Sequence, residues 1–229
     1  MSVIRFYSGP VKFTLGLLDR IDKMIRQHLT QQGLLMKRGM ATSRLYMKPD
    51  DMGMGLKSCV GVYLLELVRL LLQYKWGTIF RREWFWRTEE MTKKNGNCVL
   101  LREIEKVLRR FGGSLEWLLE RIQLREEDMG NIMQNRENGE REKEQLIRAK
   151  RMKSIEEVLE EVDVLIDTHF FNEFGGTKSS TFLKKIIDNR GSIDMSLLKK
   201  SWRSLNCTPK TMKVIREIQE NLLCVGKRR

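Results

Sequence analysis

Apolar residues recur at helical spacing along almost the whole chain. From Thr14 to Leu29, leucines and isoleucines return at three- and four-residue steps, which places them on one face of a helix. The 229 residues include only three prolines and few runs of β-branched residues, so little in the sequence breaks helices or favours strands. We therefore predict an all-α, multi-helix bundle.

One stretch departs from this pattern. Leu45-Tyr46-Met47 favours an extended strand, and Pro49–Gly55 holds enough proline, aspartate and glycine to reverse the chain. We expect a short loop or hairpin near residues 44–56 that leads into the most apolar helix, Leu56–Trp76, which should be surrounded by other elements. An ordinary linker between helices is the alternative.

Local signals predict several further elements. Val99–Phe111 and Ser114–Leu124 should form a helical hairpin joined by two glycines, with Ser114 as the N-cap of its second helix. Thr14 could cap the first helix of the chain in the same way. A later amphipathic helix starts at Ile155 and is expected to end around His169 to Phe171.

A charged segment separates the two ends of the chain. Residues 125–153 alternate in sign and hold few apolar side chains, which is typical of a solvated helix with ion pairs or of a mobile linker. We expect a thumb-like helical domain over 1–124, the charged helix or linker over 125–153, and a C-terminal helical linker domain over 154–229.

The net charge is strongly positive, at +13. The surplus lies at the ends, with nine basic and two acidic residues over 1–48, whereas 101–160 holds thirteen basic and fourteen acidic residues. Such a surplus favours a polyanionic partner, above all nucleic acid. No stretch combines a basic face with bulky apolar residues as an interfacial helix does, and Val60–Leu72 is too short to span a bilayer. We expect an intracellular protein, nuclear or cytoplasmic, without membrane contact.

Metal and cofactor chemistry find no support in the sequence. The four cysteines lie at long, irregular spacings, and both histidines are far from them, so the close ligand pairs of a zinc site are missing. Reduced and mostly buried thiols are expected instead. No Ser/His/Asp or Cys/His set suggests a nucleophile, and the expected cofactor is none.

Aromatic and basic residues alternate in Phe80–Arg87. Arginines between tryptophans and phenylalanines are what a platform for stacking single-stranded bases needs. The same aromatic residues could instead dock a helix on the core. A third possibility is a docking surface for a partner protein, formed around Trp84 to Met91.

Two parts of the chain resemble a known family. The front of the chain resembles the segment just after the polymerase core of non-LTR retrotransposon reverse transcriptases. The most similar of these come from elements that carry a restriction-like endonuclease. The resemblance is carried by Val11-Lys12-Phe13-Thr14, Leu18–Arg26, Leu29-Thr30, Arg44-Leu45-Tyr46 and Gly53-Met54-Gly55-Leu56. The end of the chain, Thr211–Arg229, looks like the segment before the zinc knuckle and endonuclease of that family.

The resemblance implies a thumb and post-thumb linker, separated from fingers and palm before Met1 and from knuckle and endonuclease after Arg229. Such a region would grip template–primer RNA or DNA through phosphates, weakly and without sequence preference. The aromatic-x-Asp-Asp strand of the polymerase is absent, and Asp50-Asp51 lies on an expected turn without a third carboxylate for two Mg²⁺ ions. The chain is therefore expected not to be an enzyme.

The expected phosphate-contacting residues come from both ends of the chain. They are Lys12, Arg20, Lys23, Lys37, Arg38, Arg44, Tyr46, Lys48, Lys199, Lys200 and Arg203. The alternatives to nucleic-acid binding are a helical protein–protein interaction module and a retroelement remnant without function.

Overall fold

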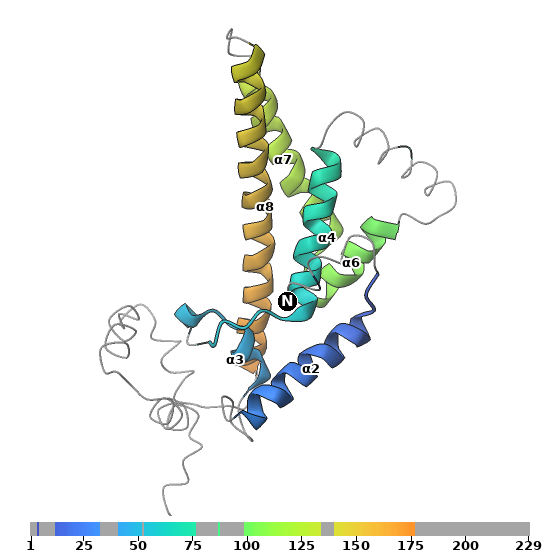
Figure 1. The fold of residues 1–229 in the computed structure, drawn as a ribbon, viewed down its shortest axis with the longest axis vertical. Helices are drawn as coiled ribbons and strands as arrows, with labels where there is room; N and C mark the ends of the chain where they lie inside the picture. Colours follow the sequence, from blue (N-terminus) through green and yellow to red (C-terminus); the bar gives the residue numbers. More distant parts are fainter. Residues whose placement is uncertain are drawn as a thin grey trace, which may run out of the picture. The chain divides into compact units, whose positions relative to one another are not determined.

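A computed structural model describes residues 4, 12–32, 41–51, 53–76, 87, 99–133 and 140–176. The expected all-α multi-helix bundle is confirmed, and these residues contain no β-strand. The elements, shown in Figure 1, are the helices α2 (Leu15–Gln31), α3 (Thr42–Tyr46), α4 (Cys59–Lys75), α6 (Val99–Arg110), α7 (Leu115–Met133) and α8 (Glu140–Gly176), with one 3-10 turn, η1 (Pro49–Asp51).

The chain divides into two compact units, each built from two separate segments. Unit 1 comprises residues 1–18 and 59–166, and unit 2 comprises 19–58 and 167–229. The charged segment 125–153 is helical wherever it is described, because α7 continues to Met133 and α8 starts at Glu140. Of the two possibilities for this segment, a solvated helix or a linker, the described part is a helix. The domain boundaries expected from the sequence stay a prediction.

The core of unit 1 is built around α4. Ten of its residues are buried, among them Tyr63, Leu64 and Leu72, which confirms the expected helix surrounded by other elements. Cys59 at its start is a buried free thiol, as expected. Helix α4 packs against α6, and α6 packs against α7. Each partner helix adds a buried apolar stripe, and these stripes include Ile104, Val107, Leu108 and Phe111 on α6, Leu118 and Ile122 on α7, and Val158 and Val162 on α8.

The hairpin between α6 and α7 forms as its sequence predicts. Gly112 has φ of 78°, a left-handed conformation that glycine adopts without a steric penalty. Ser114 Oγ accepts a hydrogen bond from the Trp117 backbone N–H at 3.1 Å, so Ser114 is the N-cap of α7. Gly113 lies close to Leu108 and Leu165, where a Cβ would collide with the Leu165 side chain. The two glycines therefore permit both the turn and its close packing.

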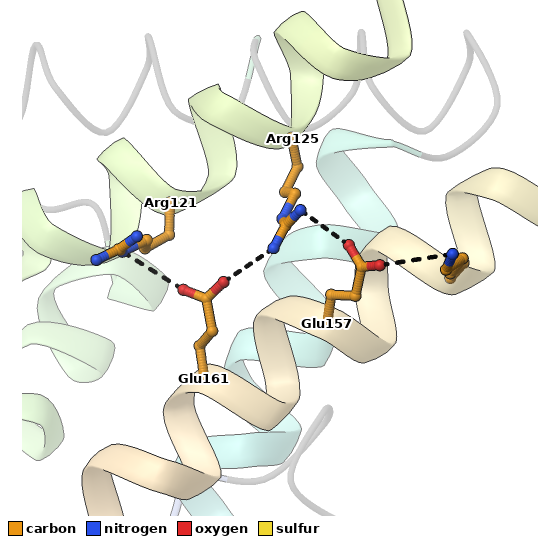
Figure 2. Close-up of polar contacts among 5 residues, drawn as sticks. Arg121, Arg125, Glu157 and Glu161 are labelled. Atoms are coloured by element: carbon orange, nitrogen blue, oxygen red, sulfur yellow. Dashed lines mark hydrogen bonds and ion pairs between the residues drawn. The ribbon is translucent and has the colours of Figure 1, made fainter.

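Ion pairs join α7 to α8 on the polar side of unit 1. Arg125 donates towards Glu157 at 3.1 Å and towards Glu161 at 3.2 Å, and Arg121 lies 3.4 Å from the second oxygen of Glu161 (Figure 2). All four side chains are partly exposed, so each pair contributes about 0.2–1 kcal/mol. Charges of opposite sign on α7 and α8 thus link these two neighbouring helices (Figure 1).

Helix α2 is capped as expected and buries part of its apolar face. Thr14 Oγ1 accepts a hydrogen bond from Leu17 N–H at 3.3 Å. Leu18 is fully buried, whereas Met24 is 58% exposed and Asp22 is buried. Of the apolar face expected over residues 14–29, Leu18 is buried and Ile21, Ile25 and Leu29 are half-buried, whereas Leu17 and Met24 are exposed. Helical spacing fixes which residues share a face, but the neighbouring elements decide which part of that face they cover.

The chain reverses between residues 44 and 56, as predicted, but without the expected strand. Residues 42–46 form the short helix α3. The returning backbone donates hydrogen bonds from Met54 N–H to Arg44 O at 3.0 Å and from Leu56 N–H to Leu45 O at 2.9 Å. The strand expected at Leu45–Met47 was wrong. Leu45 and Tyr46 belong to the α3 turn of helix and pack in one cluster with Leu29, Leu56 and Phe170, while Met47 follows α3 in an extended conformation.

Helix α8 is longer than its sequence predicts. It continues past the expected end near Phe171 to Gly176. Phe174 is buried against Met47, with Phe170 and Phe171 packed alongside, and Tyr46 stacks on Phe170 with ring centroids 4.8 Å apart. The last turn of α8 is thus retained because it covers the 41–47 segment, a long-range contact within unit 2.

Candidate nucleic-acid interface

Several of the expected contact residues lie outside the described part of the chain. These are Lys37, Arg38, Lys199, Lys200 and Arg203. The aromatic and basic segment Phe80–Arg87 and the docking surface around Trp84 to Met91 fall there as well, apart from Arg87, which is helical and exposed. All of these stay predictions from the sequence.

Helix α2 presents positive charge on its exposed side. Arg20 and Lys23 are exposed, and they lie three residues apart, so they share one face of the helix. Of the two acidic residues of this helix, Asp22 is buried and Asp19 is half-buried. The burial of Asp22 makes the exposed side of α2 more basic than its composition indicates.

Arg44 and Tyr46 belong to the packing of the loop. Arg44 is 4% exposed and engaged within the protein, and Tyr46 is 8% exposed. The Arg26 guanidinium on α2 donates a hydrogen bond to the Tyr46 hydroxyl at 2.6 Å. Tyr46 thus joins α3 to α2 and, through Phe170, to the end of α8 inside unit 2. Arg44 and Tyr46 are both buried, so neither presents a free surface to a phosphate.

Lys48 is half-exposed and forms an ion pair. Its Nζ lies 2.6 Å from Asp167 Oδ2 on α8, and Asp167 is 9% exposed. A nearly buried carboxylate holds a lysine more firmly than an exposed one does, because water screens the pair less. Lys48 is therefore anchored, although part of its side chain still reaches solvent.

Lys12 pairs with a buried carboxylate in unit 1. Its Nζ lies 3.1 Å from Glu103 Oε2, and Glu103 is 5% exposed. Tyr63 lies in the same neighbourhood, since its ring meets Phe13 edge-on at 5.7 Å. Burial, and to a lesser extent the Glu103 charge, raise the pKa of Tyr63 above 10.0, while a hydrogen bond with the Phe13 backbone opposes them. Lys12 is thus tied to α6.

The structure also shows a basic surface that the sequence analysis missed. Four cationic residues of α6 are exposed, namely Arg102, Lys106, Arg109 and Arg110. The averaged charge of residues 101–160 is close to zero, which hides them. The signal that could have found them is the spacing of Arg102, Lys106 and Arg110 at four-residue steps, opposite the apolar residues of the same helix.

No candidate metal-binding set emerges in the described residues. Asp51 lies on the η1 turn, where its N–H bonds to Lys48 O, as the turn-rich sequence predicts. Among the described side chains, no three of His, Cys, Asp and Glu gather closely enough to hold a metal ion. The described helices include none with the length and apolar character needed to cross a membrane.

The best-defined candidate surfaces are therefore electrostatic, and each belongs to its own unit. One is the exposed side of α2 around Arg20 and Lys23 in unit 2, and the other is the exposed side of α6 in unit 1. Comparison with protein-family models, with curated proteins and with solved structures finds no match for this chain.

Proposed function

We propose that this chain is a non-catalytic nucleic-acid-binding region, corresponding to the thumb and post-thumb linker of a non-LTR retrotransposon reverse transcriptase. It binds template–primer RNA or DNA through phosphates, without sequence preference, in the nucleus or the cytoplasm. The observation that carries the proposal is the charge of α2, whose exposed side holds Arg20 and Lys23 while Asp22 is buried. The net charge of +13 supports it.

Three residues that the sequence predicted to contact phosphate have a structural role in this proposal. Tyr46 and Lys48 shape the loop beside α2 through the Arg26–Tyr46 hydrogen bond and the Lys48–Asp167 ion pair, and the carbonyl of the buried Arg44 accepts a hydrogen bond from Met54 N–H within the loop. They hold the site in position, and phosphate contact falls to Arg20 and Lys23. Such contacts release counterions from the nucleic acid, so the affinity falls steeply as salt rises.

The test is binding of the full chain to an RNA–DNA heteroduplex across a salt series. Each phosphate contact adds roughly 0.9 to the slope of log K against log salt. The variant Arg20→Gln/Lys23→Gln should therefore reduce that slope by about 1.8. A matched control is Arg69→Gln/Lys153→Gln, which removes two exposed charges from α4 and α8 and should leave the slope nearly unchanged.

The outcomes separate the proposal from its alternatives. Binding that is insensitive to salt, or equal loss of slope in both variants, would contradict a specific phosphate contact on α2. If the wild-type chain does not bind any heteroduplex at low salt, a protein-docking module or a remnant without function is favoured instead.

A further inference from the structure

Helix α6 is strongly two-sided. Its apolar residues Ile104, Val107 and Leu108 are buried in unit 1, and its exposed side carries Arg102, Lys106, Arg109 and Arg110. Of its two acidic residues, Glu103 is buried and paired with Lys12, and Glu105 is half-buried and paired with Arg109. The acidic groups of α6 are thus held by partners, and its solvent side is predominantly cationic.

The spacing of these cations suits a regular polyanion. Arg102, Lys106 and Arg110 follow one another at four-residue steps, which drift by only about 40° around the helix and rise by roughly 6 Å each. Together with Arg109, four cations therefore occupy about 12 Å of the helix axis, in successive steps of roughly 6, 4.5 and 1.5 Å. A nucleic-acid strand carries about one phosphate per 3.4 Å of its axis, so a backbone that follows this helix presents several phosphates over the same length.

Stabilisation of the helix itself explains only part of the pattern. Cations in the last turn interact favourably with the helix dipole, and Arg109 and Arg110 are placed there. Arg102 and Lys106 lie outside the last turn, and Lys106 forms no ion pair within the described part of the chain. Helix stability therefore gives no reason for Lys106.

A nucleic-acid backbone fits this surface better than a membrane does. A helix that binds the membrane interface inserts its apolar side among the lipids. The apolar side of α6 is already buried against α4 and α7, so only charge is available outside. We infer that the exposed side of α6 is a second phosphate-binding surface of the chain, one that binds a nucleic-acid backbone without reading its sequence.

This inference rests on the proposed function in one respect, which is that the chain binds nucleic acid. The residues are different, because α6 lies in unit 1 whereas Arg20 and Lys23 lie in unit 2. The test uses the full chain and the same heteroduplex salt series. Arg102→Gln/Lys106→Gln should lower the slope of log K against log salt by about 1.8 and weaken binding equally on unrelated sequences. Arg69→Gln/Lys153→Gln is again the matched control, and circular dichroism confirms that each variant is folded.

Each result separates the two surfaces. An unchanged slope in the α6 variant, with a reduced slope in Arg20→Gln/Lys23→Gln, overturns the α6 inference and leaves the proposed function standing. The reverse pattern supports α6 and contradicts the contact on α2. If the wild-type chain binds no heteroduplex, both fail.

Two competitors test the identity of the ligand. Polyglutamate at the same charge concentration should displace the heteroduplex poorly, and equally good displacement would overturn the assignment to nucleic acid in favour of an acidic protein. Vesicles of phosphatidylserine and phosphatidylcholine should bind the wild type and the α6 variant alike. A loss of vesicle binding in that variant, with its heteroduplex binding intact, would overturn the inference in favour of a membrane surface.

Discussion

Lys48 and Asp167 form a close ion pair that joins the loop before η1 to α8, with Nζ 2.6 Å from Oδ2. Asp167 is nearly buried while Lys48 still reaches solvent. The pair is therefore less screened than a surface pair, and the carboxylate depends on its partner for compensation.

Replacing Lys48 by methionine should destabilise unit 2. The variant keeps the length of the side chain but leaves a nearly buried carboxylate without its cation, and we expect a loss of about 1–2 kcal/mol. Urea unfolding of Lys48→Met, Asp167→Asn and the double variant gives the coupling energy. The double variant should be more stable than the sum of the single losses indicates, and strict additivity would show that the two groups do not interact.

Gly53 lies where the loop leaves no room for a side chain. A Cβ added there would overlap the backbone carbonyl of Met47, which cannot move without disturbing the Gly55 N–H to Met47 O hydrogen bond of 2.9 Å. Gly53→Ala should therefore cost at least about 2 kcal/mol in the free energy of unfolding.

Gly16→Ala is the matched control for this substitution. Gly16 lies in the first turn of α2, where a Cβ would meet open space, so alanine should be neutral or stabilise the protein by up to about 1 kcal/mol. Thermal unfolding of both variants measures the contrast. A similar midpoint for the two would mean that the loop relaxes freely around Gly53.

The helices and their caps could be predicted from the sequence because their signals are local. The caps at Thr14 and Ser114 and the turn at Gly112 each depend on a few neighbouring residues. The errors at Leu45–Met47 and at the end of α8 have another cause. There, contacts between residues far apart in the sequence, such as Met47 with Phe174, decide the outcome.

The candidate site was predictable in its charge but not in its arrangement. The sequence shows how many arginines and lysines an end of the chain holds, but not that Arg44 is buried while Arg20 is exposed. The surface on α6 was missed for a related reason. Its cations share a segment with acidic residues, and only the fold shows that Glu103 turns inward to pair with Lys12.

Tyr63 should make the stability of the protein depend on alkaline pH. Its buried hydroxyl has a pKa raised above 10.0, chiefly by burial, so the folded protein holds this proton more firmly than the unfolded chain does. Stability from this group is complete below about pH 10 and is lost as the pH rises towards the folded pKa, by at most ~1.4 kcal/mol per pH unit.

The variant Tyr63→Phe isolates this effect from the titration of lysines. Urea unfolding of both proteins between pH 8 and about 11 should show a smaller decline in the variant above pH 10. Parallel declines would mean that Tyr63 ionises as readily in the folded protein as in the unfolded chain.

Arg125 contacts two glutamates of α8 at once, so its truncation should weaken the contact between α7 and α8. Because the groups are partly exposed, Arg125→Ala should cost about 0.5–1 kcal/mol at low salt, and the loss should shrink as salt screens the pairs. Lys153→Ala, which removes a single pair at 4.0 Å, should cost less than Arg125→Ala. Urea unfolding at about 0.05 M and 1 M NaCl measures both. A loss in Arg125→Ala that does not change with salt would indicate that the arginine acts through packing of its aliphatic stem rather than through its charge.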